Sequence, residues 1–220
     1  MTTGELAKTA VDLAGLMKVL GESLYSTRTV AIRELVQNAH DSITRRQIED
    51  AGSGTAPAIT LSVEPERGLL HIEDNGAGLT DEEVRRYLAT VGAGYTRTLR
   101  DAGAGDELIG YFGLGFLSAF VVAQKVEVWT CSYQTPEQPW LFSSRSGESY
   151  SLRPAEPRPV GSRVTLELRR DYRTLSDARA LERVVARYCR LLSLPIRLEG
   201  AEPVNAEPPP WRLPQSVSAL

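Results

Sequence analysis

Three polar side chains lie on one stripe of a predicted helix. In "RELVQNAHD", residues 33–41, Glu34, Asn38 and Asp41 are spaced by four and then three residues. This spacing places them within roughly 60° of each other around an α-helix. The opposite side of the helix is apolar: Ile32, Val36, Ala39 and Ile43. A solvated face opposite a buried face explains this layout without any chemistry, so the stripe alone does not identify a site.

A first glycine-rich stretch, "HIEDNGAGLT" at residues 71–80, ends a predicted strand on Asp74. Asn-Gly is a common turn dipeptide, and a plain turn is one interpretation. The other interpretation is a binding site for a planar ring. The carboxylate of Asp74 can accept a hydrogen bond from an exocyclic amine, while Gly76 and Gly78 leave room for the ring to approach the backbone.

A second glycine-rich stretch, "GYFGLGF", carries Gly110, Gly113 and Gly115 just before the apolar run "LSAFVVA". These glycines permit either close helix packing or a phosphate cradle made of backbone N–H groups at a helix N-terminus. No Gly-Lys-Ser/Thr follows them, so the stretch is not a Walker loop. No clear βαβ unit precedes them, which excludes a convincing dinucleotide fingerprint.

Taken in this order, the three elements predict a nucleotide site. The Asp-Gly turn would recognise a base, and the glycine loop would hold the phosphates. The helical stripe would supply an oxygen ligand for Mg²⁺ and a carboxylate that orients a water molecule. The polar face of the helix would then line a pocket.

Composition limits the class of protein. The chain has 220 residues and a formal net charge of −3, which argues against a general nucleic-acid surface. Cys131 and Cys189 are far apart, and we expect two buried thiols in a reducing compartment. The polar N-terminus lacks the apolar run of a secretory signal, and no stretch has the roughly 20 apolar residues of a membrane span. We therefore expect a cytoplasmic protein that binds neither nucleic acid nor membranes.

The elements that must position these residues follow from periodicity and turn signals. We expect helices over residues 11–24, 29–50, 79–91 and 176–192, the third with Thr80 and Glu83 as a capping box. Strands are expected over 58–65, 68–74, 125–133, 140–145, 148–154, 161–170 and 195–199, and residues 92–107 are expected to be mobile. The order predicts an α+β fold, a two-layer sandwich with a mixed, mostly antiparallel sheet and helices on one face.

Three ordered motifs resemble the GHKL ATPase superfamily, which includes gyrase, histidine kinases, mismatch-repair proteins and the ninety-kilodalton heat-shock chaperones. "LYSTRTVAIRELVQNAHDSI" resembles the first conserved helix block of the chaperone N-terminal domain. "IGYFGLGFLSAFVVAQKVEVWT" is similar to its glycine block, and "VGSRVTLELRRDY" to its Gly-Thr strand, with Ser162 in place of Thr. The resemblance covers most of residues 11–200 and implies a Bergerat-type ATP-binding fold.

The resemblance also implies roles for individual residues. Glu34 would be the general base that positions the attacking water, and Asn38 would supply an oxygen to Mg²⁺. Asp74 would bind the adenine amine with support from Ser162, and Asp41 would make an indirect hydrogen bond. The remaining residues expected to contact ATP or ADP are Gly76, Gly78, Leu79, Gly110, Gly113, Gly115 and Phe116.

Some positions depart from the chaperone pattern. Ala93 stands where the family usually has a lysine near the phosphates, and Arg86 and Tyr87 stand where asparagines are common. The lid expected over residues 92–109 is short. These departures bear on nucleotide affinity and lid closure. One alternative is therefore a nucleotide-gated binding module with little catalysis, and another is an ATPase of the topoisomerase or mismatch-repair type.

The C-terminal part of the sequence predicts the domain organisation. Residues 1–200 would form the ATP-binding domain, and residues 201–220 a Pro-rich linker to a middle domain that this chain lacks. The resemblance implies an arginine in that middle domain, so we expect the fragment to hydrolyse ATP slowly. It further implies Mg-dependent hydrolysis coupled to lid closure, client proteins as partners and a homodimer in the full-length protein.

Overall fold

The computed structural model describes residues 29–89 and 115–206, and within them one sheet carries every strand. The strand order is β5-β4-β3-β6-β2-β1-β7, and only the β1–β7 pair is parallel. The strands are β1 (Ile59–Glu64), β2 (Leu69–Asp74), β3 (Ala123–Cys131), β4 (Trp140–Ser144), β5 (Tyr150–Pro154), β6 (Gly161–Leu168) and β7 (Ile196–Leu198). The sheet is therefore mixed and mostly antiparallel.

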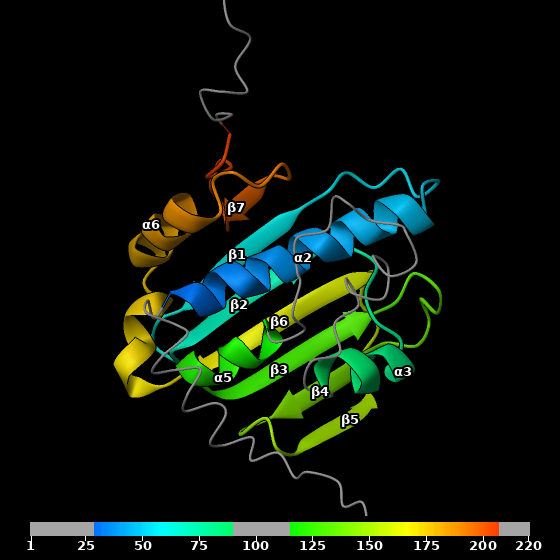
Figure 1. Cartoon of the computed structure of the whole chain (residues 1–220), viewed down its shortest axis with the longest axis horizontal. Helices are drawn as coiled ribbons and strands as arrows, with labels where there is room; N and C mark the ends of the chain where they lie inside the picture. The colour runs from blue at the N-terminus through cyan, green and yellow to red at the C-terminus, as the bar shows by residue number, and fades with distance from the viewer. Residues whose placement is uncertain (1–28, 90–114, 207–220) are drawn as a thin grey trace, which may run out of the picture.

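The helices lie over one face of this sheet (Figure 1). They are α2 (Val30–Glu49), α3 (Asp81–Glu83), the 3₁₀ turn η3 (Phe116–Ser118), α5 (Ala119–Val122) and α6 (Ala178–Tyr188), with a second 3₁₀ segment η4 (Arg170–Ser176). The long helix α2 runs along β1 and β2, and α6 lies beside β7 and the start of α2. The predicted two-layer α+β architecture is confirmed.

The hydrophobic core fills the space between the helices and the sheet. In β1 and β2, alternate residues point into it, so Leu61, Leu70 and Ile72 are almost completely buried. From α2, Ile32, Val36, Ala39 and Ile43 are buried against them, as the helical periodicity predicts. This packing fixes the rotation of α2 and hence the direction of its polar stripe.

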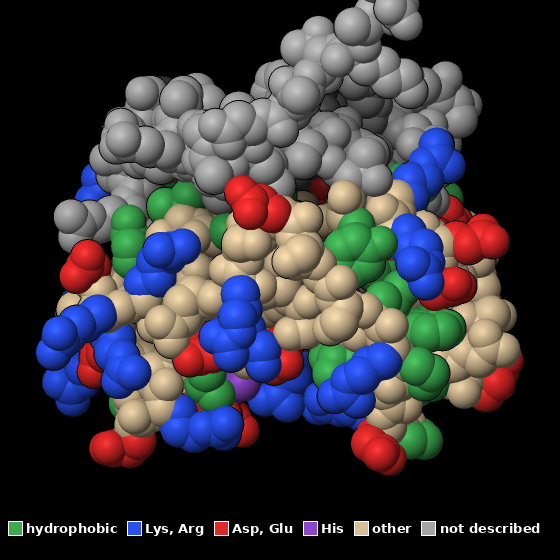
Figure 2. Space-filling view, turned by 90° about the horizontal axis from the view of Figure 1, so that it is seen from below, with side chains coloured by type: hydrophobic (Ala, Val, Ile, Leu, Met, Phe, Trp, Pro, Cys, Tyr) green, Lys and Arg blue, Asp and Glu red, His purple; other side chains and the backbone are tan. Residues whose placement is uncertain are grey.

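The opposite face of the sheet carries polar residues. The cross-strand rows there include Glu73 next to Arg163, and Lys125 next to Glu167. In Figure 2, positive and negative side chains are interspersed on the side away from the grey segments. An antiparallel sheet with one polar face produces this alternation.

Several boundaries differ from the prediction. The single helix expected over residues 79–91 is instead a short α3 followed by a π-helical segment, η2 (Val84–Leu88). Its predicted capping box is confirmed: Thr80 Oγ1 accepts from the N–H of Glu83, and Glu83 accepts from the N–H of Thr80. The strand expected over 161–170 ends at Leu168, and η4 follows it. The helix expected over 11–24 and the segment 92–107 lie outside the described residues.

The first residues of the predicted linker pack against the domain. Asn205 Oδ1 accepts from the N–H of Ile196, and its Nδ2 donates to the carbonyls of Leu192 and Leu194. Pro203 forms an isolated bridge with Arg197. None of the helices in the described part of the chain has the length and apolar character needed to cross a membrane.

Candidate functional site

Asp74 occupies the last position of β2, in the middle of the sheet. Asp74 is only 9% exposed, and it lies directly opposite Ser162 of the neighbouring strand β6. Its Oδ1 accepts two hydrogen bonds, from the Ser42 hydroxyl of α2 and from the backbone N–H of Gly76, each 2.9 Å long. Neither of these donors occupies Oδ2. The carboxylate is thus held in one orientation by α2 and by its own turn.

Burial has a large effect on this carboxyl group. It raises the pKa of Asp74 from 3.8 to about 7, although hydrogen bonds from Gly76, Ser42 and the backbone of Ser162 act in the opposite direction. Desolvation disfavours the charged form of any acid. A carboxyl with such a shifted pKa at the end of a strand is a candidate binding group.

The glycines after Asp74 allow the turn to pack closely against its neighbours. A Cβ on Gly76 would overlap the Ser42 hydroxyl and lie only 2.5 Å from the carbonyl carbon of Ser42 in the α2 backbone, well inside van der Waals contact. Gly78 has φ of +61°, and a Cβ there would overlap the carbonyl oxygen of Cys131. Both glycines therefore have a packing role in addition to the room for a ring that the sequence predicts.

Thr130 of β3, which is fully buried, connects the turn to β6. Its Oγ1 accepts from the backbone N–H of Leu79 at 2.8 Å and lies 2.9 Å from the Ser162 hydroxyl. The structure thus brings Asp74, Leu79 and Ser162 together at the end of β2. Sequence reasoning missed Thr130, because nothing in its local sequence distinguishes it from an ordinary strand residue.

The polar stripe of α2 meets the end of the glycine block. A Cβ built on Gly115 would lie 3.0 Å from Glu34 Oε2 and 3.8 Å from Asn38 Nδ2. Arg33 also donates to Glu34 Oε1, with Nη2 at 2.6 Å and Nε at 3.2 Å. The Glu34 side chain is 23% exposed, and Asn38 is exposed. Both side chains can therefore reach a ligand beside Gly115.

Asp41 and Phe116 take less accessible positions. Asp41 is buried, and its Oδ1 lies 3.6 Å from Nδ1 of His40. The ring of Phe116 is buried and packs edge-on against Phe120 and Phe142 in the core. Gly110 and Gly113 lie outside the described residues, so the structure places only the Gly115 end of the predicted cradle.

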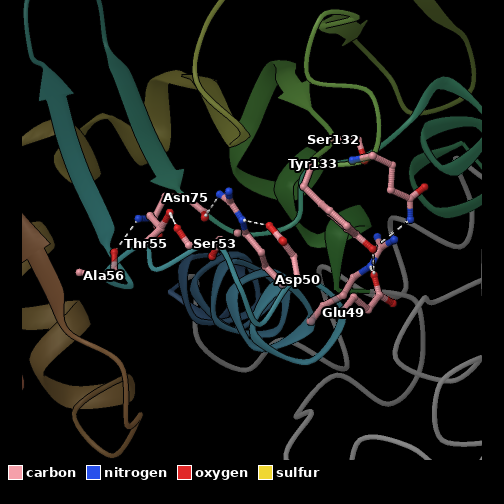
Figure 3. A network of polar contacts seen from close by, with 12 residues as sticks. Glu49, Asp50, Ser53, Thr55, Ala56, Asn75, Ser132 and Tyr133 are labelled. Atoms are coloured by element: carbon pink, nitrogen blue, oxygen red, sulfur yellow. Dashed lines mark hydrogen bonds and ion pairs between the residues drawn. The ribbon is translucent and has the colours of Figure 1, made fainter.

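A polar network fixes the turn that follows Asp74 (Figure 3). Asn75 Nδ2 donates to the Ala56 carbonyl, and Asn75 Oδ1 accepts from the N–H of Ala58. Arg46 of α2 donates to the Asn75 carbonyl at 3.0 Å and pairs with Asp50 at 3.4 Å. Both α2 and the segment before β1 therefore hold the backbone next to Asp74.

Ser42 is the other residue of the candidate site that sequence reasoning missed. It follows Asn38 by four residues, and Asn38 follows Glu34 by four, so it extends the same stripe. This spacing is a signal that could have identified it. The stripe thus runs from Glu34 at the Gly115 end to Ser42 at the Asp74 end.

Asn38 suits a hard cation. Mg²⁺ prefers oxygen ligands and usually keeps several waters, so one exposed carboxamide oxygen beside a phosphate is a suitable protein contribution. Asn38 is exposed and lies next to Gly115. The described residues contain no cluster of three or more His, Cys, Asp or Glu side chains that could hold a metal ion alone, so Asn38 fits a Mg²⁺ that is held mainly by phosphate and water.

A separate cavity of about 410 Å³ is lined by Gln124, Leu168, Arg170 and Arg173. Leu168 is at the opposite end of β6 from Ser162, roughly 20 Å away along the strand. This cavity is therefore not part of the site around Asp74.

Comparison with known proteins gives a consistent result. Residues 25–147 match the family described as histidine kinase-, DNA gyrase B- and HSP90-like ATPase. The chain is 32% identical over 219 residues to the chaperone protein HtpG of Roseobacter denitrificans, covering 94% of this chain and 35% of that protein. It is 35% identical over 208 residues to HtpG of Rhodospirillum rubrum, covering 87% of this chain and 33% of that protein.

The similarity extends to a mammalian protein. The mitochondrial heat shock protein 75 kDa of Bos taurus is 31% identical over 193 residues, which cover 84% of this chain and 28% of that protein. The chain thus spans about a third of the length of the curated relatives it matches.

Proposed function

The chain belongs to the family of histidine kinase-, DNA gyrase B- and HSP90-like ATPases, and on this premise we propose that it binds and hydrolyses ATP as the N-terminal domain of a molecular chaperone. The observation that carries the proposal is the stripe of α2, which spans from Glu34 beside Gly115 to Ser42 on Asp74. One helix thereby joins a base-recognition end and a phosphate end in a single site.

At the base-recognition end, Asp74 would accept a hydrogen bond from the adenine amine. Ser42 and Gly76 donate to Oδ1, and the backbone of Ser162 is a third donor to this carboxyl, so the proposal gives the adenine amine a remaining lone pair on Oδ2. Leu79 is partly buried beside the core and would pack against the face of the base. A buried carboxylate that is oriented before binding loses little entropy when the ligand arrives.

At the phosphate end, Glu34 would hold the attacking water and accept its proton. The carboxylate lies beside Gly115, and Arg33 restrains one of its oxygens. Backbone N–H groups in and after the glycine block would bind the phosphate oxygens. Asn38 would hold Mg²⁺, which when bound neutralises charge on the phosphate oxygens. The presence of Glu34 at this point favours hydrolysis over passive nucleotide binding.

The assignment to a chaperone rests on the relatives, which are named as chaperone or heat shock proteins. We include in the proposal client proteins as partners, a homodimer of the full-length protein, and closure of a lid formed by residues 92–109. We also include residues 1–200 as the ATP-binding domain. A reducing compartment such as the cytoplasm is supported by the two cysteines, both buried free thiols.

Calorimetric titration with Mg-ADP and Mg-ATP tests the proposal. The parent should bind both nucleotides, and Asp74→Asn should bind neither at the same concentrations. Asn can still accept from Ser42 and Gly76 through Oδ1, so its amide group replaces Oδ2 and opposes the adenine amine, donor against donor. The fold should remain intact, as circular dichroism would show.

Two results would contradict the proposal. If the parent binds neither nucleotide, the proposed ATP site is wrong. Equal binding by the parent and by Asp74→Asn would show that adenine is not recognised at this carboxylate. In a full-length protein, Glu34→Ala should abolish turnover while leaving ADP affinity within about threefold of the parent value.

A further inference from the structure

Arg45 is a buried cation on α2 that the assigned nucleotide contacts do not include. It is 4% exposed and follows Asp41 by four residues, one turn further along the helix. Its Nη2 donates to Glu83 Oε1 at 2.5 Å, and its Nε donates to Glu49 Oε2 at 2.8 Å. The Tyr133 hydroxyl donates to the same oxygen of Glu49 at 3.0 Å (Figure 3).

Glu83 uses its two oxygens for two different elements. Oε1 accepts from Arg45, while Oε2 accepts from the backbone N–H of Thr80 at 2.9 Å. Thr80 is the N-cap of α3, and its hydroxyl accepts from the N–H of Glu83. The capping box of α3 is thus attached through one carboxylate to the helix that carries Glu34 and Asn38.

The residue before this cap is Leu79. Its N–H donates to Thr130 Oγ1, which in turn lies against Ser162. The backbone at Leu79 and Thr80 is therefore fixed from two sides: by Thr130 of the sheet and, through Glu83, by Arg45 of α2. The two attachments are independent, because they use different strands and helices.

We propose that Arg45 is a positioning residue for the adenine end of the site, which it holds in place through Glu83 and the Thr80 cap. This inference rests on the proposed function, because it assigns Leu79 to the face of the base. The hydrogen bonds of Arg45 to Glu83 and Glu49 lead to the Thr80 cap and away from Gly115, so its loss should weaken ADP and ATP binding by the same factor. Charge-assisted hydrogen bonds between the buried guanidinium of Arg45 and the partly buried carboxylates of Glu83 and Glu49 give the geometry its rigidity.

The first test is titration of Arg45→Met, which keeps the length and apolar stem of the side chain but removes the charge. We expect the dissociation constants of Mg-ADP and Mg-ATP both to rise by about tenfold, and Arg45→Lys to recover part of the loss. Glu83→Gln should have a similar effect, since Gln can still cap α3 but cannot form the ion pair. The double variant should bind no more weakly than Arg45→Met alone.

The second test needs no nucleotide. In Arg45→Met, hydrogen exchange at the backbone N–H of Thr80 should accelerate by about tenfold, while exchange in the β1–β2 ladder stays unchanged. The matched control is Arg67→Met, which breaks the ion pair between Arg67 and Glu64. This pair is at the surface, since the Arg67 side chain is 70% exposed. This control should alter neither exchange at Thr80 nor nucleotide affinity.

The outcomes separate this inference from the proposed function. If the parent binds nucleotide and folded Arg45→Met binds both nucleotides with unchanged affinity, the positioning role is wrong and the proposed function stands. If Arg45→Met weakens the binding of ATP but not of ADP, the positioning role is also wrong, because Arg45 would then act at the phosphates. If the parent binds no nucleotide, the proposed function fails, and exchange at Thr80 still decides whether Arg45 holds the cap.

Discussion

Asp74 shows how one buried residue can link stability, pH and binding. The folded protein holds the proton of this carboxyl more tightly than the unfolded chain, because burial raises its pKa from 3.8 to about 7. The proposed recognition of adenine by Asp74 needs the ionised carboxylate, whereas the empty fold favours the protonated form. Nucleotide affinity and the stability of the empty protein should therefore respond to pH in opposite directions.

The protonation of Asp74 should make the stability of the protein depend on pH. Below about pH 4, Asp74 is protonated in both states and contributes no pH dependence. Between about pH 4 and pH 7 the unfolded chain loses this proton and the folded chain keeps it, so stability falls by roughly 1.4 kcal/mol per pH unit. Above about pH 7 the contribution is constant. Urea unfolding of the parent and of Asp74→Asn should show that the stability of the variant relative to the parent rises between about pH 4 and pH 7 and then stays constant.

The exposed acid Glu82 provides the control for this experiment. Glu82→Gln should follow the pH profile of the parent. If the unfolding free energies of the parent and of Asp74→Asn change with pH in the same way, Asp74 has the same pKa in the folded and unfolded states.

Gly115 lies against the side chain that we propose as the general base. Its φ of −58° suits any residue, but an alanine Cβ would lie 3.0 Å from Glu34 Oε2 and would have to displace it. In a full-length protein, Gly115→Ala should lower kcat by about tenfold or more, because a misplaced base loses orientation. ADP affinity should change by less than about threefold. Steady-state kinetics with ADP titration would check this, and an unchanged kcat would contradict the placement of Glu34.

At the scale of elements, the turn after β2 depends on two glycines that meet different neighbours. A Cβ on Gly76 would overlap Ser42 of α2, and one on Gly78 would overlap the Cys131 carbonyl at a positive φ. Gly76→Ala and Gly78→Ala should each destabilise the fold by about 2 kcal/mol or more. Gly52, which has nothing within 4 Å of a built Cβ, is the control. Thermal unfolding should show that Gly52→Ala has a stability close to that of the parent. If Gly76→Ala loses little stability, the turn is not packed as closely as described.

The success of sequence reasoning also varied by element. Period-2 and period-3.6 patterns predicted α2 and the strands to within a few residues, and turn residues predicted the β1–β2 hairpin. The prediction of one long helix after Thr80 was wrong. A π-helical segment has apolar residues at nearly the same spacing as an α-helix, so the sequence pattern does not distinguish the two. Local sequence does not encode which carbonyl each N–H will reach.

In the candidate site, too, contacts within one element could be predicted and contacts between distant elements could not. Residues on one element, such as Glu34 and Asn38, could be grouped from spacing alone. Thr130 and Arg45 could not, because their contacts join segments more than 35 residues apart. A polar side chain in a strand or helix becomes informative only when its partner across the fold is known.

At the scale of the whole molecule, the sheet has one buried face and one polar face. Neighbouring residues of β1 illustrate this: Leu61 is fully buried, and Ser62 points the other way. Leu61→Ala should cost about 2–5 kcal/mol of unfolding free energy, whereas Ser62→Ala should stay within about 0.5 kcal/mol of the parent. Chemical denaturation of both variants tests the assignment. Equal losses at the two positions would contradict a one-sided core.

The strand order has a consequence for synthesis on the ribosome. The strand β6 lies between β2 and β3, yet it is made after both of them. The β1–β2 hairpin and the β3–β4–β5 meander can each form early, but they join only when β6 emerges and pairs with both. Asp74, Thr130 and Ser162 meet at that junction. A nucleotide can therefore act on the nascent chain only at a late step, by selecting chains in which β6 is already in place.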